Sequence, residues 1–355
     1  RRWSGRRGRP DDAVATGAGM TRVVVTGAKG FLGRYVCPLL AARGYDVVRT
    51  LRGSAVEDAE GAAFETHAVG GIGPDTDWRA ALAGAEAVVH LAARAHVMNE
   101  IVTDPAAEFM RVNAAGTLRL ARQAAEYGVK RLVFVSSVKV NGEKTADTPF
   151  RETDPPKPED DYAISKRDAE IGLCMVAEET GMEAVILRAP LIYGASVKGN
   201  FFKLLRLCDG LLPLPLASID NRRSLVFAGN MADAVVCSLE AEEAGGQTYM
   251  VGDDDDVSTP ELIRRIATAL GRTGRLFPVP VGLLRMVGGL AGKTAVIDRL
   301  TGSSWVDTSR IRHELEWAPP HGMKEGLEET AAWYKNRESV LIKITFKNEN
   351  DPIPT

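Results

Sequence analysis

The sequence predicts an α/β protein with a doubly wound parallel sheet, followed by a smaller C-terminal α/β lobe. Three β-branched residues, Val23–Val25, lead into a glycine-rich turn and then into a helical pattern. Similar apolar runs and helical stretches alternate as far as residue 187. Continuous apolar runs are typical of parallel strands that helices cover on both faces. Such an alternating order of strands and helices favours one doubly wound sheet.

The expected elements can be placed in order along the chain. Strands are expected at the start of Val23–Gly33 and at Tyr45–Leu51, Phe64–Ala68, Ala87–Ala93, Arg131–Ser137 and Ala184–Leu187. Each expected helix carries apolar residues three or four positions apart. The helices of the sheet region are expected at 34–43, 78–82, 104–127 and 162–180, and those of the C-terminal lobe at 199–209, 230–242, 259–271 and 324–335.

Composition limits the classes of function. The chain has 355 residues, of which 45% are hydrophobic, so it can bury a sizeable core. Its net charge of −3 argues against a nucleic-acid partner. Four scattered cysteines without a CxxC pair favour reduced thiols and a cytoplasmic location. No apolar stretch reaches the roughly 18–20 residues that a membrane span needs.

We expect a leader, two domains and a tail. Residues 1–19 are rich in Arg and Gly, and they are expected to form a disordered leader ahead of a natural start at Met20. The sheet domain is expected at 20–190 and the C-terminal lobe at 191–335, with some interleaving, because prolines and short elements become frequent after residue 188. Residues 336–355 show no clear pattern and are expected to be a peripheral tail.

The glycines that follow the first strand predict a dinucleotide site of the Rossmann type. Gly27, Gly30 and Gly33 have the spacing G-x-x-G-x-x-G. Such glycines permit a tight turn, a close approach of a pyrophosphate to the backbone, and close packing of the helix on the strand. The N–H groups and dipole of the helix that follows would favour the diphosphate. Cofactor contacts are therefore expected from the three glycines and from Phe31 and Leu32.

The end of the second strand bears on which dinucleotide binds. NAD sites of this kind carry an acidic residue there, which holds the ribose 2′-hydroxyl. This chain has Thr50 and Leu51 instead, with Arg49 and Arg52 on either side. A guanidinium suits a 2′-phosphate, so NADP is expected rather than NAD. Two solvated arginines at a strand end remain the alternative interpretation.

Three polar residues downstream predict proton transfer. Tyr162 and Lys166 lie four positions apart at the start of an expected helix, so they share one face. A lysine beside a phenol lowers the pKa of the phenol, which can then exchange a proton near neutral pH. Ser137 ends a strand at the carboxyl edge of the sheet, where open α/β sheets bind their ligands.

In this order and on these elements, the glycines, Ser137, Tyr162 and Lys166 resemble the extended short-chain dehydrogenase/reductase family. From about residue 20 to residue 335, the chain is similar to the nucleotide-sugar branch of that family, the UDP-glucose 4-epimerase-like epimerases and dehydratases.

Three further segments support the resemblance. Residues 90–93 (HLAA) resemble the family's cofactor-contacting strand end, which implies contacts from Leu91, Ala92 and Ala93. Asn113 lies in VNAAGTLRL, which is similar to the family's VNxxGTxxL helix, and it is expected to contact the cofactor. Ala189 lies in LRAPLIYG, which resembles the stretch that lines the nicotinamide pocket.

The resemblance implies hydride transfer between nicotinamide C4 and a sugar carbon. Tyr162 would be the acid and base on the sugar oxygen, and Ser137 would hydrogen-bond the same oxygen. Lys166 would hold the nicotinamide ribose and lower the pKa of the tyrosine. Asn200 and Arg223 match residues that contact the sugar diphosphate. The helices at 104–127 and 162–180 are those through which this family often dimerises, so a homodimer is expected.

Departures from the family pattern reduce the number of reactions that the chain is expected to catalyse. Family dehydratases carry Thr-Asp-Glu after the serine strand, whereas this chain has Ser137-Val138-Lys139, which disfavours dehydration. A 4-epimerase of a UDP-hexose or UDP-N-acetylhexosamine is the leading expectation, an NADPH-dependent 4-ketoreductase is the alternative, and a dinucleotide-binding sensor without turnover is the third. No metal site is predicted, and the acidic run Asp253–Asp256 is expected to be a solvated turn.

Overall fold

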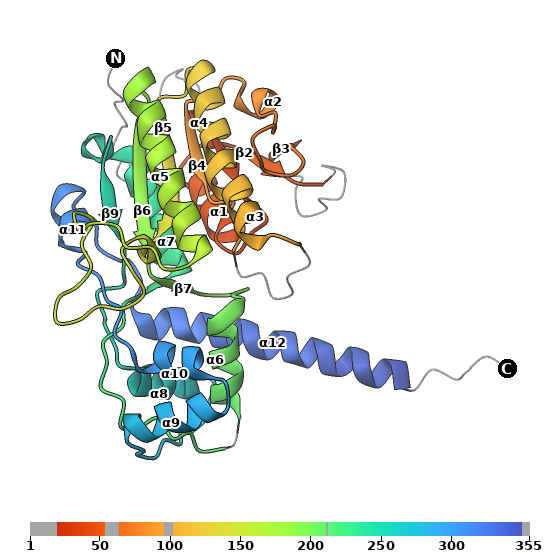
Figure 1. Cartoon of the computed structure of the whole chain (residues 1–355). Helices are drawn as coiled ribbons and strands as arrows, with labels where there is room; N and C mark the ends of the chain where they lie inside the picture. Colours follow the sequence, from red (N-terminus) through yellow and green to blue (C-terminus); the bar gives the residue numbers. More distant parts are fainter. Residues whose placement is uncertain (1–19, 54–63, 96–101, 211, 350–355) are drawn as a thin grey trace.

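The computed structural model describes residues 20–53, 64–95, 102–210 and 212–349, with side chains as far as 337. Its centre is a parallel sheet of seven strands in the order β3-β2-β1-β4-β5-β6-β9 (Figure 1). This confirms the predicted doubly wound sheet. The strands are β1 (Arg22–Thr26), β2 (Asp46–Leu51), β3 (Glu65–Ala68), β4 (Ala87–His90), β5 (Arg131–Ser137), β6 (Glu183–Ala189) and β9 (Thr248–Met250). The expectations for 1–19 and for 350–355 lie outside the described residues.

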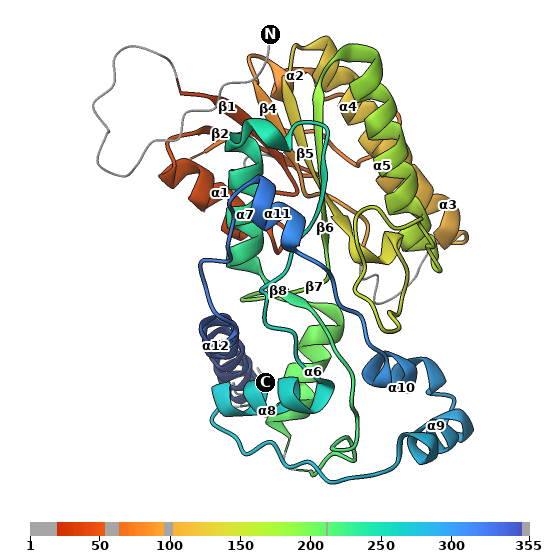
Figure 2. The ribbon, with the colours of Figure 1, turned by 90° about the vertical axis from the view of Figure 1, so that its left-hand side faces the viewer.

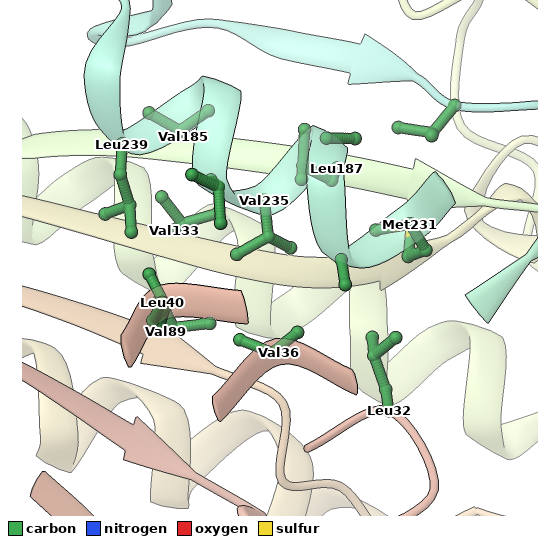
Figure 3. Close-up of a cluster of buried hydrophobic side chains, with 14 of the residues drawn as sticks. Leu32, Val36, Leu40, Val89, Val133, Val185, Leu187, Met231, Val235 and Leu239 are labelled. Atoms are coloured by element: carbon green, nitrogen blue, oxygen red, sulfur yellow. The ribbon is translucent and has the colours of Figure 1, made fainter. Parts of the chain in front are cut away.

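Helices cover both faces of the sheet, and the residues of each strand alternate between the two layers. On one face lie α1 (Gly33–Ala42), α7 (Ala228–Glu240) and α11 (Ser309–Glu314), which pack on the side chains of Val23 and Val25. Figure 3 shows this core between α1, α7 and the strands. On the other face lie α2 (Arg79–Leu82), α4 (Gly116–Glu126) and α5 (Asp161–Thr180), which pack on Val24.

The C-terminal lobe lies beyond the carboxyl ends of the strands (Figure 2). Its two-stranded sheet pairs β7 (Leu191–Tyr193) in parallel with β8 (Leu225–Phe227). Its helices are α6 (Gly199–Asp209), α8 (Thr259–Ala269), α9 (Val281–Leu290), α10 (Thr294–Thr301) and α12 (Met323–Glu349). The helix expected at 324–335 thus continues to Glu349, while β7, β8, α9 and α10 have no counterpart among the expected elements.

The chain returns to the large sheet after residue 190. Strand β9 pairs with β6 at Ile186–Arg188, and α7, which corresponds to the helix expected at 230–242, packs against α1. Helix α11 later packs on the same face through Ile311, together with Leu315 just after the helix. These elements complete the α1 face of the sheet, so two parts of the chain build one hydrophobic core.

The acidic run Asp253–Asp256 is not the solvated turn that the sequence suggests. Asp253 follows β9 and is buried, and its carboxylate accepts hydrogen bonds from Phe227 N (2.9 Å), Asn230 Nδ2 (2.7 Å) and the Tyr193 hydroxyl (2.9 Å). It therefore joins β7, β8 and α7 at the junction of the lobe with the sheet.

The other members of the run are also paired. Asp255 forms an ion pair with Arg265 (2.5 Å) and Asp256 one with Arg222 (2.9 Å). The solvated interpretation was wrong because Arg222 and the partners of Asp253 are far away in the sequence. None of the described helices is both long and apolar enough to cross a bilayer.

Candidate active site

The glycine-rich turn after β1 forms a cradle that a larger side chain would fill. Gly27 has a φ of +68°, and a Cβ there would lie 2.9 Å from the backbone nitrogen of Ala92. A Cβ at Gly33 would lie 2.4 Å from the Ala28 carbonyl oxygen. The third glycine therefore lets α1 sit on the turn itself, whereas the sequence suggested close packing on the strand.

The start of α1 is suited to an anion. The residue before the helix, Leu32, provides no side-chain cap. The N–H groups of Arg34 and Tyr35 already donate to carbonyls of the turn, Gly30 O (3.3 Å) and Leu32 O (3.0 Å), so the attraction for an anion here comes from the positive end of the helix dipole. A dinucleotide diphosphate fits this cradle, with the backbone of Gly30, Phe31 and Leu32 around it.

A buried chain of hydrogen bonds joins the carboxyl ends of β1 and β4. The N–H groups of Leu91 and Ala92 donate to Thr26 Oγ1, each at 3.2 Å. The same oxygen lies 2.6 Å from His90 Nδ1, and His90 Nε2 lies 2.9 Å from Thr117 Oγ1. Strand β4 is thereby fixed next to the glycine turn, where Leu91, Ala92 and Ala93 would face the cofactor.

The direction of these bonds follows from the donors available. Thr117 donates its hydroxyl proton to the Asn113 carbonyl (2.6 Å), so its oxygen must accept from His90 Nε2–H. His90 Nδ1 is then the acceptor of the Thr26 hydroxyl proton. Burial lowers the pKa of His90 to about 3, so the ring is neutral near pH 7. No role for His90 beyond its motif could be predicted from the sequence, because the partners that orient the ring lie on other elements.

Asn113 lies in a π-helical turn, Met110–Ala115, that interrupts the single helix expected at 104–127. The turn separates α3 (Pro105–Phe109) from α4. The Asn113 amide accepts from Arg94 N (2.8 Å) and donates to Arg94 O (3.1 Å) and Ser165 Oγ (2.9 Å). Asn113 is buried and positions the segment after β4 against α5, and its contact with the cofactor stays a prediction.

The structure brings Ser137, Tyr162 and Lys166 together. Ser137 is the last residue of β5, and Tyr162 is the second residue of α5. The Ser137 hydroxyl lies close enough to the Tyr162 phenol to lower the pKa of that phenol. One turn along α5, Lys166 Nζ donates to the Val135 carbonyl (2.7 Å) and lies 4.0 Å from the centre of the Phe134 ring. The three side chains therefore lie at the carboxyl end of the sheet, as the sequence suggested.

The expected lowering of the tyrosine pKa by Lys166 is not found in the protein alone. Burial raises the pKa of Tyr162 to about 12, although the nearby Ser137 hydroxyl opposes this shift. Burial also lowers the pKa of Lys166 to about 7, so the lysine carries less than a full charge at neutral pH. The expectation failed because it ignored desolvation of the lysine, which the Val135 carbonyl holds in the interior.

A buried ion pair lies behind the site. Glu170, one turn beyond Lys166 on α5, forms a 2.6 Å pair with Arg188 of β6 and accepts from Ser136 Oγ (2.5 Å). Arg188 also donates to Asn141 Oδ1 (3.0 Å). The Glu170 carboxylate raises the pKa of Lys166, opposing burial. This carboxylate therefore favours the charged lysine.

Lys139 lies where family dehydratases carry an acid. Its ammonium forms ion pairs with Asp160 (2.5 Å) and Glu143 (2.6 Å). Asp160 is also the N-cap of α5, accepting from Ala163 N (2.7 Å). Lys139 therefore ties the loop after β5 to the helix that carries Tyr162, and it offers no carboxylate for elimination.

The two arginines near the end of β2 differ in their surroundings. Arg49 is buried, with its guanidinium 5.0 Å from the centre of the Phe64 ring and 3.2 Å from Thr66 Oγ1. Arg52 is exposed just beyond the strand. Of the two, Arg52 is the better placed to meet a 2′-phosphate.

The two residues expected at the sugar diphosphate lie in the lobe. Asn200 is exposed at the start of α6, which begins beneath the carboxyl ends of the strands (Figure 2). Arg223 donates to the carbonyls of Arg299 (2.6 Å) and Gly302 (3.2 Å), and burial lowers its pKa. It forms no ion pair with a carboxylate of the described residues, so an anionic ligand would supply the missing counter-charge.

Comparison with known proteins agrees with this geometry. Residues 23–252 match the model of the NAD dependent epimerase/dehydratase family. The chain belongs to this family. A UDP-glucose 4-epimerase of Vibrio cholerae is 41% identical over 311 residues, which cover 87% of this chain and 94% of that one. A UDP-glucose 4-epimerase of Mycolicibacterium smegmatis is 29% identical over 333 residues, covering 89% and 99%.

Solved structures share the fold. A Thermus thermophilus UDP-glucose 4-epimerase in complex with NAD has a TM-score of 0.68 at 24% identity, covering 89% of this chain and 99% of that one. A Bacillus cereus UDP-N-acetylglucosamine 4-epimerase has a TM-score of 0.69 at 22% identity, covering 88% and 98%. The family resemblance is therefore confirmed, and the protein is an enzyme that uses a nicotinamide dinucleotide.

The buried lysine gives a pH dependence that can be measured. We expect the cofactor-free protein to gain stability as the pH rises from about 7 to about 10.5. The pKa of Lys166 is about 7 in the folded protein against an ordinary value of 10.5. Between these values the unfolded chain binds more protons, so the free energy of unfolding rises with pH, by about 1.4 kcal/mol per unit. Below pH 7 this contribution is constant.

Urea unfolding at a series of pH values would measure this slope. Lys166→Met should remove the contribution, and Lys203→Met, at an exposed lysine of α6, should leave it unchanged. Equal slopes in wild type and Lys166→Met would contradict the assignment.

Proposed function

We propose that this enzyme is a 4-epimerase of a nucleotide-linked hexose, a UDP-hexose or a UDP-N-acetylhexosamine. The observation that carries the proposal is that Ser137, Tyr162 and Lys166 lie together, with the Ser137 hydroxyl close enough to lower the pKa of the Tyr162 phenol, at the end of the sheet that also holds the glycine cradle. The 41% identity to a protein named UDP-glucose 4-epimerase supports it.

The chain's own groups would move the proton and hold the substrate. A bound nicotinamide dinucleotide would supply a hydride acceptor and donor. Tyr162 would take the proton of the sugar 4-hydroxyl and later return it, while Ser137 hydrogen-bonds the same oxygen. Lys166, released from the Val135 carbonyl toward the nicotinamide ribose, would bring a positive charge closer to the phenol and lower its pKa.

The lobe would hold the nucleotide diphosphate. Arg223 combines a partly buried guanidinium with the two carbonyl contacts that fix its position. A planar fork of N–H donors suits phosphate oxygens. Asn200, at the first turn of α6, would add a neutral donor. Elimination of water is not part of the proposal, because Val138 and Lys139 replace the two acids.

A second candidate is an NADPH-dependent 4-ketoreductase. The exposed Arg52 and the absence of an acid at the end of β2 favour NADP in either case. An epimerase returns its cofactor to the starting state in each turnover, whereas a ketoreductase consumes NADPH. The fate of the dinucleotide therefore separates the two reactions.

Replacing the proposed acid and base should stop turnover. We expect Tyr162→Phe to lower the rate of interconversion of UDP-glucose and UDP-galactose, or of their N-acetyl forms, by at least about a hundredfold. The rate can be followed by chromatography of the sugar nucleotides. The variant should release as much dinucleotide on denaturation as the wild type. Tyr127→Phe, at an exposed tyrosine after α4, is the matched control. Substantial turnover by Tyr162→Phe would refute the assignment.

Denaturing the purified enzyme should release the cofactor for identification. We expect NADP rather than NAD.

Replacing Arg52 tests the choice of dinucleotide in a second way. Arg52→Ala should weaken NADP binding by about tenfold and leave NAD binding unchanged, because the Arg52 guanidinium would contact only the 2′-phosphate. Calorimetry with each dinucleotide measures this, with Arg122→Ala on α4 as control. Stoichiometric NAD in the wild type would contradict the choice of NADP while leaving the epimerase proposal in place.

A homodimer and a cytoplasmic location are also proposed. Ile171 and Met175 lie one turn apart on α5 and are 51% and 54% exposed. Large exposed apolar side chains that share a helix face are typical of an interface. All four cysteines are free, in keeping with a reducing compartment.

Size-exclusion chromatography with light scattering tests the interface. The wild type should elute as a dimer and Met175→Glu as a monomer, because a charge would be buried at the interface. Leu207→Glu, at a residue of α6 that is 41% exposed, should stay dimeric. A monomeric wild type at high concentration would remove this proposal.

A further inference from the structure

Helix α9 presents a stripe of apolar side chains to solvent. Leu283, Met286, Val287 and Leu290 are 45%, 59%, 55% and 86% exposed. Their spacing of three, one and three residues places them on one face of the helix. We refer to these four residues as the α9 face. An exposed helix face of a globular lobe is ordinarily polar, so this apolar face indicates an interaction site.

The opposite side of α9 is packed and fixes its orientation. Leu284 is buried in the core of the lobe, and Gly288 is so close to α10 that a Cβ there would lie 2.6 Å from Ile297 Cγ1. Arg223 and Asn221 hold the end of α10 through the carbonyls of residues 299, 300 and 302. The two helices are therefore anchored as a unit, with the α9 face outward.

Neighbouring segments add more exposed apolar surface. Phe277, four residues before α9, is 44% exposed, and Val296 of α10 is 49% exposed. Figure 1 shows α9 at the end of the lobe that is farthest from the large sheet. A partner could therefore reach this surface without meeting the sheet domain.

The charge around the α9 face is positive although the chain as a whole is acidic. Residues 272–300 contain five basic residues and one acid, Asp298, whereas the whole chain has a net charge of −3. Arg275 and Lys293 are exposed and form no ion pair with a carboxylate of the described residues. Arg285 and Lys144 share Asp298, at 3.6 and 3.7 Å. An anionic partner would meet little opposing charge here.

We propose that the α9 face docks the enzyme on an anionic phospholipid surface. An apolar helix face with basic flanks is the pattern of an interfacial helix, which buries its apolar side at the boundary of headgroups and acyl chains. Basic residues close to the bilayer add attraction to anionic headgroups. Contact through α9 would hold the substrate lobe against the membrane and leave the sheet domain in water.

The same charges argue against a second copy of this chain as the occupant. Two copies of the α9 face would bring two basic surfaces together. A helix of ten residues also offers less than the roughly 800 Å² per partner that a stable interface buries. Neither constraint applies to an anionic bilayer, which adapts to the helix and carries the opposite charge.

Flotation of the full chain with lipid vesicles tests the proposal. We expect binding to vesicles of phosphatidylcholine and phosphatidylglycerol, weaker binding to phosphatidylcholine alone, and loss of the difference at high salt. Leu290→Glu, which puts a carboxylate at the most exposed position of the stripe, should reduce the bound fraction at least about tenfold. The double variant Arg275→Ser/Lys293→Ser should lower binding to the anionic vesicles only.

A matched control separates position from charge. Tyr127→Glu adds the same charge at an exposed residue of the sheet domain and should bind vesicles like the wild type. All variants should keep wild-type turnover of a water-soluble nucleotide sugar, so failure of the proposed reaction would be seen separately. The proposal is overturned if wild type binds both vesicle types equally, binds neither, or binds no better than Leu290→Glu. An oligomer that Leu290→Glu disrupts in the absence of lipid would also overturn it.

Discussion

The close approach of β1 and β4 is the constraint on which the site depends. The strand order changes direction here, because β1 connects forward to β2 on one side and pairs with β4 on the other. Open α/β sheets bind ligands at such a point. The approach needs a glycine at 27, since any Cβ would strike Ala92, and it is held by the Thr26 hydroxyl, which binds both His90 and the backbone after β4.

The chain of hydrogen bonds that starts at Thr26 also fixes the position of α5, the helix that carries Tyr162 and Lys166. His90 hydrogen-bonds Thr117, and Thr117 hydrogen-bonds Asn113 in the π-helical turn. Asn113 in turn hydrogen-bonds Ser165 on α5. Ser165 immediately precedes Lys166. The cofactor cradle and the proton-transfer residues are thereby connected through neutral buried groups, which keep their geometry over a wide pH range because none of them titrates near neutrality.

Charge in the site is controlled by burial and by one compensating carboxylate. Desolvation lowers the pKa of Lys166, and the Glu170 carboxylate, which Arg188 pairs at 2.6 Å, opposes that effect from one turn away. Tyr162 likewise remains protonated in the protein alone. Proton transfer therefore depends on how bound ligands change the charge states of Lys166 and Tyr162. The family pattern identifies the residues but not these charge states.

The sequence was enough to predict the sheet, the order of strands and helices along the chain, and the placing of Ser137, Tyr162 and Lys166 at one end of the sheet, because these depend on local patterns. A strand covered on both faces must be apolar throughout, and residues four apart on a helix must share a face. It could not determine β9, which has only three residues and owes its place to pairing with β6. Nor could it determine the pairing of Asp253–Asp256, the role of His90 or the low pKa of Lys166. Each of these depends on partners or burial contributed by distant segments, and only the tertiary structure brings those together.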